Sequence, residues 1–568
     1  MPMSRGRRRA GVAAVAAVLV ACAVGQGHPP AAQARPAPPP DAIGRWTAPF
    51  GEGDVLAPGA VEAAVLPDGR VFYFTGTENP DHPAPPPRHG GVRLLDLRSG
   101  TPEWTAPREG GAGELFSSDL TTLPDGRLLL AGGPHTASLY DPRTNSVAAT
   151  APMISERWYP HAAVGADGDA TVFGGVGRLL GDPPPGPVRR TETYHADTGT
   201  WQENAAGPAS ENELPPEPRI VLAPNGKFFY AAAGELGDPS AAAASGATAA
   251  LYQFFDPKTR KWQVSGPAPL GARSGAFVVP LPLEPPYDRM TLVTGGGVLG
   301  PVPAGMASPS TTLTAVDANG EVGSRSTGDL DHPRWFSSGV LLPDGQILAV
   351  GGADRDDTLA PGTAGAVRIP ELYDPATGKW TDVAPSLHPR GFRHTALLLP
   401  DMRVLVGGGA DDASFELWSP PYLFRGPRPV VKQVQRAVSY GESFDITTPD
   451  ADLVESVVLL RTPSPEHGND SDERALRLEF SRSGETTLTA TAPPAGTVAP
   501  PGLYYLVINT KSLQGPIPSV ARMVAVGHTD VGEALQPYAD DAPAPVGGSA
   551  PAPDHPGALP RPWPSAAR

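Results

Sequence analysis

The stretch Leu123–Gly133 reads LPDGRLLLAGG, and it decides the fold because close copies of it recur along the chain. The copies begin at Leu66 (LPDGRVFYFTG), Gly165 (GADGDATVFGG), Ala223 (APNGKFFYAAAG), Leu342 (LPDGQILAVGG) and Leu399 (LPDMRVLVGGG), with a looser copy at Tyr287 (YDRMTLVTGGG). Each copy joins a turn dipeptide to a short strand rich in β-branched and aromatic residues and then ends in glycine. Repetition of such a unit predicts an array of small sheets.

A second phrase follows the glycines and has its own fixed spacing. It reads LYDPRTNSV, TYHADTGTW, FFDPKTRKW and LYDPATGKW in four of the copies. In three of them the separation between the aromatic residue and the tryptophan is the same: Tyr194 to Trp201, Phe255 to Trp262 and Tyr373 to Trp380. A double glycine, a Tyr-Asp-Pro phrase and a tryptophan at a period of about fifty residues resemble the kelch repeat.

The kelch resemblance implies an all-β fold. One unit is a four-stranded blade that cannot bury both of its faces alone, and radial packing of blades buries them around a central channel. We therefore predict a seven-bladed kelch-type β-propeller over residues 44–423, with the aromatic residues wedged between blades. Short alternating strands from SFDITTP to SVARMVAVG predict an immunoglobulin-like β-sandwich over residues 428–527.

Both ends of the chain have the composition of export and linker segments. Residues 1–21 join the basic MPMSRGRRR to an apolar run too short to span a bilayer comfortably, which predicts a signal peptide. The LVAC that ends at Cys22 resembles the lipobox of bacterial lipoproteins, so we expect lipidation of Cys22 and a place on the cell surface. Plain secretion, with cleavage near the AQA of residues 32–34, is the alternative. Residues 22–43 and 528–568 are rich in Pro and Ala and predict a disordered tether and tail.

The composition excludes some classes of partner and some kinds of chemistry. The chain has 44 basic and 60 acidic residues and a net charge of −16, which argues against nucleic acid as a partner. Cys22 is the only cysteine, so the mature chain has no disulfide and no thiolate for a metal or a substrate. We expect a monomer that reaches a membrane only through the lipid on Cys22.

The order of the two predicted domains, with three phrases at and after their junction, resembles the copper-radical oxidases, galactose oxidase and glyoxal oxidase. The phrases are FELWSPPYLF, VVLLRTPSPEHGNDSDER and PPGLYYLVINTKSLQGPIPSVARMV. The resemblance covers nearly all of the chain between its flanks. It implies the fold more firmly than the activity, because function belongs to the site.

The resemblance implies one copper ion near the propeller axis, held by two tyrosines and two histidines, with one tyrosine cross-linked to a cysteine. Oxidation of alcohols or aldehydes, with reduction of O₂ to peroxide, needs both the copper and the tyrosine radical. The family's cysteine corresponds to Ser117, and its cross-linked tyrosine, in RWYP, corresponds to Tyr159. The family's YHSTALLLP corresponds to FRHTALLLP, so Phe392 replaces the axial tyrosine and Arg393 replaces a histidine. The second histidine corresponds to His467.

Three of these five positions therefore lack the required side chain. Phe392 has no oxygen for copper, and Arg393 stays protonated and repels a cation. His394 is one residue further along a strand and is expected to face the other way, so its recruitment through a bulge is not favoured. We expect no copper cofactor, and we interpret Tyr159 and His467 either as a weak metal or ligand site or as inherited packing.

Four residues are candidates for binding a ligand at the channel mouth. Arg334 corresponds to an arginine that contacts the sugar in galactose-oxidising relatives, with a rim salt bridge as the alternative. Together with Arg393 it predicts a cationic patch for an anionic or polar ligand. Trp158 and Trp335 are suited to stacking on a sugar ring, or to wedging between blades. The acidic HGNDSDER lacks EF-hand spacing, and we interpret it as a solvated loop rather than a calcium site.

Three functions are consistent with these residues. The favoured hypothesis is an exported, non-catalytic envelope protein that binds a carbohydrate or an envelope protein at the channel mouth. The first alternative is a copper-radical oxidase of alcohols or aldehydes with a rearranged site. The second is a purely structural module of the cell envelope. The absent cysteine separates the first hypothesis from the oxidase, because the tyrosine radical is harder to form and to hold without the thioether.

Overall fold

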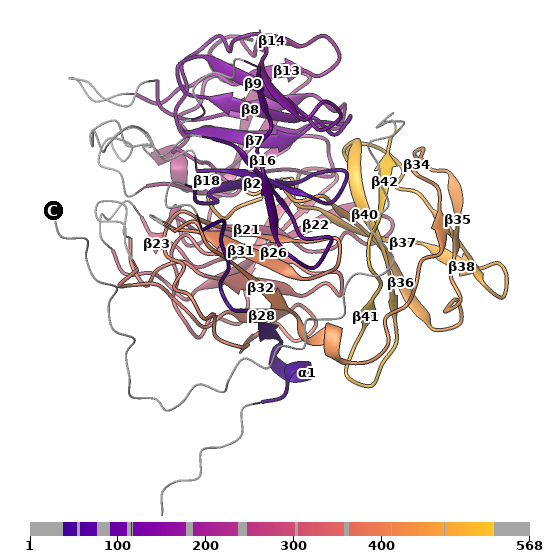
Figure 1. The fold of residues 1–568 in the computed structure, drawn as a ribbon. Helices are drawn as coiled ribbons and strands as arrows, with labels where there is room; N and C mark the ends of the chain where they lie inside the picture. The colour runs from indigo at the N-terminus through magenta and orange to yellow at the C-terminus, as the bar shows by residue number, and fades with distance from the viewer. Residues whose placement is uncertain are drawn as a thin grey trace, which may run out of the picture. The chain divides into compact units, whose positions relative to one another are not determined.

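The computed structural model describes residues 38–53, 57–75, 91–110, 115, 117–177, 186–236, 247–300, 305–356, 363–409, 412–470 and 472–527 (Figure 1). The predicted signal peptide, Cys22 and the tail 528–568 lie outside these residues. Within them, no helix is long and apolar enough to cross a membrane. Almost every regular element is a strand, and the all-β prediction is confirmed.

Seven sheets of four or five strands lie in the described residues between 45 and 419. The first sheet along the chain contains β2 (Glu62–Val65), β3 (Val71–Phe74), β4 (Arg93–Asp96) and β5 (Glu103–Thr105), the second contains β6 (Arg108–Gly110), β7 (Ser118–Thr122), β8 (Leu128–Gly132), β9 (Thr136–Asp141) and β10 (Ser146–Ala149), and the third contains β11 (His161–Val164), β12 (Ala170–Phe173), β13 (Glu192–His195) and β14 (Thr200–Glu203). The fourth contains β15 (Ile220–Leu222), β16 (Phe228–Tyr230), β18 (Leu251–Asp256) and β19 (Lys261–Pro267), and the fifth contains β21 (Phe277–Pro280), β22 (Arg289–Gly295), β24 (Thr311–Asp317) and β25 (Val322–Ser326). The sixth contains β26 (Ser338–Leu341), β27 (Ile347–Val350), β28 (Glu371–Asp374) and β29 (Lys379–Asp382), and the last contains β30 (His394–Leu398), β31 (Val404–Gly408), β32 (Phe415–Ser419) and the N-terminal β1 (Arg45–Trp46).

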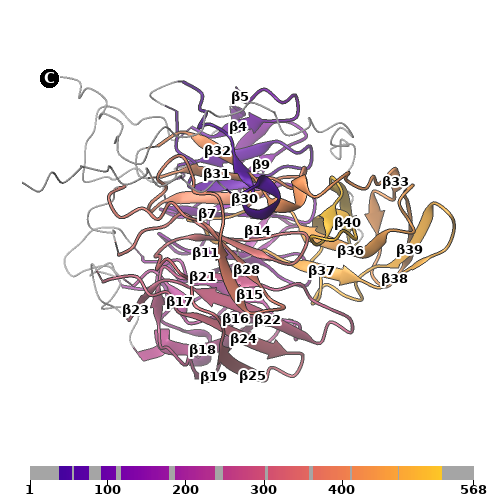
Figure 2. The same cartoon turned by 90° about the horizontal axis from the view of Figure 1, so that it is seen from below.

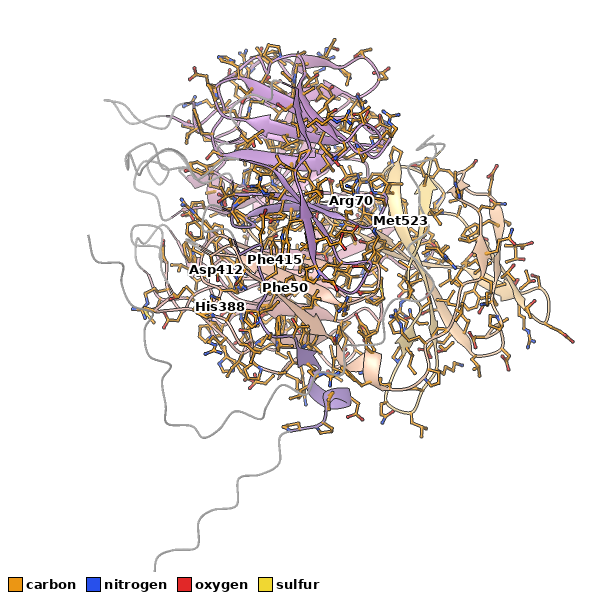
Figure 3. All side chains as sticks on the ribbon, viewed as in Figure 1. Phe50, Arg70, His388, Asp412, Phe415 and Met523 are labelled. Atoms are coloured by element: carbon orange, nitrogen blue, oxygen red, sulfur yellow. The ribbon has the colours of Figure 1, made fainter. Side chains whose placement is uncertain are left out.

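One edge strand of each sheet is its inner strand, and successive inner strands contact one another: β30 with β2, β2 with β7, β7 with β11, β11 with β15, β21 with β26, and β26 with β30. The N-terminal β1 completes the sheet of β30–β32 by pairing with β32. Phe50 lies beside Phe415 where this pairing ends, with ring centroids 6.0 Å apart (Figure 3). The last sheet is therefore built from both ends of the propeller sequence, as expected for a closed ring.

The aromatic residues of the second repeated phrase meet as the spacing predicts. Tyr194 and Trp201 are directly opposite each other in the β13–β14 hairpin, with ring centroids 5.1 Å apart. The Phe255–Trp262 and Tyr373–Trp380 pairs repeat this arrangement at 5.3 and 5.0 Å. The indole of Trp201 donates to the carbonyl of Ala151, just past the preceding sheet. The pairs therefore pack between neighbouring sheets.

Short elements complete the propeller region. A three-stranded sheet joins β17 (Ala233–Gly234), β20 (Arg273–Ser274) and β23 (Val298–Leu299), and short 3-10 turns lie at η1 (Pro208–Ser210), η2 (Ala247–Ala250) and η3 (Pro421–Phe424). Part of the predicted tether is ordered, because α1 (Pro40–Ile43) forms one helical turn. The carbonyl of Ile43 accepts a bond from the amide of Ala384, so the tether prediction fails for these residues.

The C-terminal strands form two sheets of their own, coloured orange to yellow in Figures 1 and 2. One sheet has the order β33 (Gln433–Val434), β35 (Ser443–Thr447), β39 (Thr487–Thr491) and β38 (Phe480–Arg482). The other has β34 (Ala437–Val438), β42 (Arg522–Val526), β40 (Gly502–Thr510), β36 (Val454–Arg461) and β37 (Ala475–Leu478), with β41 (Ile517–Pro518) beside β40. Their inner faces share one apolar core, as expected for a sandwich.

The loop that joins β36 to β37 supplies hydrogen-bond partners to the inner strands. The amides of Ala63 and Val65 in β2 donate to the carbonyls of Pro465 and Pro463. The amide of Val164 in β11 donates to a carboxylate oxygen of Asp472 at 3.1 Å. Each of these donors faces the channel at the open edge of its sheet, where it would otherwise lack a partner.

The same loop and the strand ends beside it reach four more inner strands. Asn469 accepts from the amide of Val278 in β21, and Glu473 accepts from the amide of Leu341 in β26. Arg461 donates to the carbonyl of Thr122 in β7, and Arg474 donates to the carbonyl of Leu222 in β15. The interpretation of HGNDSDER as a solvated loop is therefore wrong: its described residues are mostly buried against the propeller.

We predict that Asp472→Ala destabilises the protein, because it leaves the amide of Val164 and the hydroxyl of Thr121 buried without an acceptor. The expected loss is about 2 kcal/mol of unfolding free energy, measured by urea and thermal unfolding. Asp445→Ala is the matched control, since its exposed carboxylate accepts a bond only from Thr489 among the described residues. Equal unfolding midpoints for the two variants would contradict this role of the loop.

Candidate functional site

Six sheets share an unusual feature at the start of their inner strands. Each is entered through a residue with left-handed backbone angles, at φ between 46° and 64°: Ser117, Tyr159, Glu217, Gly275, Phe336 and Arg393. Five of the six are not glycine, and such a conformation costs about 1 kcal/mol or more for each. Strained backbone of this kind concentrates at functional sites.

The left-handed residues are linked to one another by hydrogen bonds. The amide of Tyr159 donates to the carbonyl of Ser117 at 3.3 Å, and the amide of Glu217 donates to the carbonyl of Tyr159 at 3.0 Å. On another part of the ring, the amide of Phe336 donates to the carbonyl of Gly275 at 2.7 Å. The structure therefore brings Ser117 next to Tyr159, as the family resemblance implies, and adds Glu217 on the other side of Tyr159.

Ser117 occupies the predicted position of the cross-linking cysteine. Its side chain is buried, and its hydroxyl has no hydrogen-bond partner among the described residues. Tyr159 is half-buried and packs against Trp158 and Val176. A serine oxygen cannot form the thioether, so Tyr159 lacks the sulfur that would tune and hold a radical.

Phe392 and Arg393 differ in their surroundings. The Phe392 ring is buried between Trp335, Phe336 and the imidazole of His467, with centroid distances of 4.8, 4.8 and 6.3 Å. Arg393 is half-buried, and its guanidinium carbon lies 5.2 Å from the centre of the Phe392 ring. Its Nε is buried without a hydrogen-bond acceptor in the described part of the chain.

His467 lies at the centre of a cluster of carboxylates that the sequence analysis did not predict. Its Nδ1 is 3.4 Å from Oε1 of Glu62 and 3.6 Å from Oε1 of Glu217, and it also contacts Oε1 of Glu466. All four side chains are buried. Glu62 is the first residue of inner strand β2, and it meets Glu466 through an antiparallel bridge between the propeller and the loop.

This cluster has two cationic neighbours, Arg219 and Arg393, whose charges act on Glu217 and His467. Nη1 of Arg219 lies 3.9 Å from Oε2 of Glu466, and its guanidinium also sits 5.3 Å from the centre of the Phe336 ring. Both carboxylate oxygens of Glu62 lack a hydrogen-bond donor within the described residues, as do Oε2 of Glu217 and Oε2 of Glu466. Buried carboxylates normally have donors or cations as partners, so these oxygens are available for a cation.

Burial shifts the titration of the whole cluster. It raises the pKa of Glu466 to about 8, against the opposing charge of Arg219. It raises the pKa of Glu217 to about 7, and burial together with Glu466 raises the pKa of Glu62 well above its usual range. Burial lowers the pKa of His467 to about 4, despite the nearby Glu217. Without a bound cation, the cluster therefore favours neutral carboxylic acids beside a neutral imidazole.

Arg334 has no exposed surface and is not at a rim. Its guanidinium donates to Oε1 of Glu371 at 2.7 Å and to the carbonyls of Gly351 and Ile369. Arg157 makes the equivalent buried pair with Glu192 at 3.0 Å. Arg334 is therefore one of a repeated set of buried ion pairs, and it adds nothing to a cationic patch with Arg393.

The two tryptophans and His394 also lie within the packing. Trp335 is fully buried against Phe336 and Phe392, and Trp158 is nine per cent exposed and packs on Val176. Nδ1 of His394 lies 2.7 Å from the carbonyl of Gly391, and Nε2 lies 3.2 Å from the carbonyl of Val350. Nε2 also lies 3.0 Å from the hydroxyl of Ser338 in β26, so the imidazole of His394 bonds within the packing of β26 and β30 and not with the cluster around His467.

One sequence signal would have found Glu217. In five copies of the repeated turn phrase, the residue six positions before the start of the phrase has left-handed backbone angles. These residues are Ser117, Tyr159, Glu217, Phe336 and Arg393. Aligning the copies at this position would have marked each of these left-handed residues as a candidate. Glu62 and Glu466 carry no comparable signal, because only the tertiary bridge brings them together.

The similarity to known proteins agrees with this geometry. Residues 428–526 match the family model of the galactose oxidase-like early set domain. The chain is 24% identical to galactose oxidase of Gibberella zeae over 528 residues, which covers 86% of this chain and 71% of that protein. It is 27% identical over 345 residues to aldehyde oxidase GLOX of Vitis pseudoreticulata, which covers 54% of this chain and 61% of that relative.

A solved structure supports the fold. A fungal alcohol oxidase in complex with copper superimposes with a TM-score of 0.71 at 22% identity, covering 85% of this chain and all of that chain. The predicted resemblance to galactose and glyoxal oxidases is therefore confirmed. The activities belong to the relatives, and whether this chain shares them depends on its own site.

The residues present do not fit the copper-radical cofactor that the relatives suggest. Of the five side chains it requires, Tyr159 and His467 remain, while Ser117, Phe392 and Arg393 stand at the other positions. The donors that surround His467 are carboxylates. Three of the five side chains that the resemblance implies for the radical site are therefore replaced.

We predict that the metal-free protein loses stability as the pH rises from about 6.5 to about 8. The folded-state pKa values of Glu466 and Glu217 are raised, so stability present at low pH is lost as the unfolded chain ionises first. Below pH 6.5 the lowered pKa values of His161, His394 and His467 act in the opposite direction. Thermal unfolding in the presence of a chelator, at several pH values, measures this.

The control variant is Glu466→Gln, which removes one raised carboxyl and keeps the size of the side chain. Its unfolding free energy should fall less between pH 6.5 and 8, by about 1 to 2 kcal/mol. A pH dependence identical to that of the unaltered protein would show that Glu466 ionises normally.

Proposed function

We propose that this chain is an exported galactose oxidase-like protein of the cell envelope that does not carry out radical oxidation and binds a polar ligand at the channel mouth. Arg393 is the observation that carries the proposal. A permanently charged guanidinium stands where the relatives' pattern has a metal-binding histidine, and its Nε is buried without an acceptor among the described residues.

The ligand class follows from Arg393 and its neighbours. A guanidinium whose Nε has no acceptor among the described residues suits a carboxylate or a set of hydroxyl groups. Tyr159 is half-buried, and the backbones of Tyr159 and Glu217 are hydrogen-bonded. A tyrosine ring beside hydrogen-bonding groups suits a sugar. We therefore favour a carbohydrate, in particular one that carries a uronic acid carboxylate, over an envelope protein.

Binding to a glycan array that contains neutral and uronic-acid glycans tests this proposal. We expect the protein to bind acidic glycans and Arg393→Ala to lose at least about ten-fold in affinity, since one charge-assisted hydrogen bond is removed. Arg482→Ala, at an exposed arginine of the C-terminal sheets, is the matched control. Absence of binding to every glycan, or equal binding by the two variants, would overturn the proposal.

A second candidate function is a copper-dependent oxidase with a rearranged site. It is favoured by the extended similarity to galactose oxidase and by the proximity of Tyr159, Glu217 and His467. Lipidation of Cys22 and export remain predictions that bear equally on both candidates.

Peroxide release separates the two candidates. The purified protein, supplied with copper(II), should release no peroxide from galactose, glyoxal or glycolaldehyde. Ser117→Cys, Phe392→Tyr and Arg393→His, combined in one variant, restore the missing side chains, and we expect this variant to gain a tyrosine-radical absorption band on oxidation. Peroxide release by the unaltered protein would establish the oxidase and overturn the proposal of a non-catalytic site.

A further inference from the structure

We propose that Glu62, Glu466 and His467, with Glu217 beside them, form a binding site for one divalent transition-metal ion of the manganese or zinc type. The site uses His467 together with carboxylates that are not among the five residues that the resemblance implies for copper. The inference goes beyond the proposed function and does not depend on it.

The geometry of the three central groups is that of a metal site. One donor atom from each of Glu62, Glu466 and His467 lies within 4.8 Å of the other two, so a single ion placed between them reaches all three. Metal–ligand distances of about 2.0 to 2.2 Å to oxygen and nitrogen are compatible with this spread. Glu217, with Oε1 3.6 Å from Nδ1 of His467, is positioned to supply a fourth donor.

Independent support comes from the unpartnered oxygens of Glu62. Its side chain has no exposed surface, yet neither carboxylate oxygen accepts a hydrogen bond from the described residues. The fully buried carboxylate of Glu371 differs, because its two oxygens accept bonds from Arg334 and from the amides of Asp331 and His332. A buried carboxylate without donors is costly unless a cation pairs with it.

Charge balance favours a dication. Ionised Glu62, Glu217 and Glu466, with Asp119 acting on Glu62, carry four negative charges, and Arg219 and Arg393 supply two positive charges. A divalent ion neutralises the remaining two. The ion would also hold the carboxylates ionised, which burial alone disfavours.

The donor types select the kind of ion. Carboxylate oxygens suit magnesium, calcium and manganese, whereas an imidazole nitrogen suits zinc, iron and copper. A set of three oxygens and one nitrogen therefore suits manganese(II) or zinc(II) better than calcium or magnesium. The four side chains that would bind the ion are buried, whereas the neighbouring side chains of Arg393 and Tyr159 are half-buried.

A second carboxylate group in the described residues provides the control. Asp331, Glu371 and Asp382 also bring donor atoms within 4.8 Å of one another, but Asp331 and Asp382 are exposed and Glu371 is already bonded to Arg334. It is therefore a carboxylate cluster of similar size whose buried member already has its partners, and we do not expect it to hold an ion.

Metal binding to the chelator-treated, full-length protein tests the proposal at one fixed pH. Calorimetric titration with manganese(II) and with zinc(II), backed by elemental analysis after dialysis, should give one equivalent of at least one of the two ions. We expect Glu62→Gln and Glu466→Gln each to weaken binding by at least about 100-fold, and Asp382→Asn to leave it unchanged. Both glutamine variants keep the size of the side chain, and their unfolding temperatures establish that they fold.

The outcomes separate this site from the proposed function. Binding that survives Arg393→Ala and Tyr159→Phe but is lost in Glu62→Gln supports the cation site whether or not a glycan binds. Failure of both ions to bind, or equal binding by Glu62→Gln and Asp382→Asn, overturns the inference. Copper(II) that binds and depends on Tyr159 but not on Glu62 also overturns it, and indicates a family-type site instead.

Discussion

The structure depends on the loop between β36 and β37, which satisfies the open edges of the inner strands. A propeller leaves the amides and carbonyls of its inner strands facing the channel, where water would have to pair with them. Here Pro463, Pro465, Asn469 and Asp472 supply acceptors to strands of three sheets. The same loop carries Glu466 and His467, so the packing that completes the fold also positions the candidate site.

This constraint explains why the loop is acidic and yet buried. Carboxylates that point into the propeller accept backbone amides that would otherwise be unpaired, as Asp472 does for Val164 and Glu473 does for Leu341. Charged residues in a loop usually remain in solvent, and the composition of HGNDSDER therefore predicted a solvated loop. The tertiary setting, with strand edges around the loop, reverses the expectation.

Much of the fold was predictable from the sequence, because the repeat has a fixed local chemistry. The turn phrase, the glycines and the aromatic-to-tryptophan spacing each act over a few residues, and the Tyr194–Trp201 contact follows directly from the hairpin register. The adjacency of Ser117 and Tyr159 was also predictable from matching motifs. Glu62 and Glu466 were not, since they are far apart in the sequence and meet only across a tertiary bridge. The resemblance was misleading at Arg334 for a related reason. It implied that this arginine contacts a ligand, whereas in the structure the guanidinium pairs with the carboxylate of Glu371.

The cation site that we propose is built from the carboxylates of Glu62 and Glu466 and the imidazole of His467. Anomalous diffraction from crystals of the chelator-treated protein soaked in manganese(II) locates such an ion without reference to activity. We expect one anomalous peak within bonding distance of Glu62, Glu466 and His467. No peak at these residues, or a peak bonded to Tyr159 with Glu62 turned away, would contradict the proposed site.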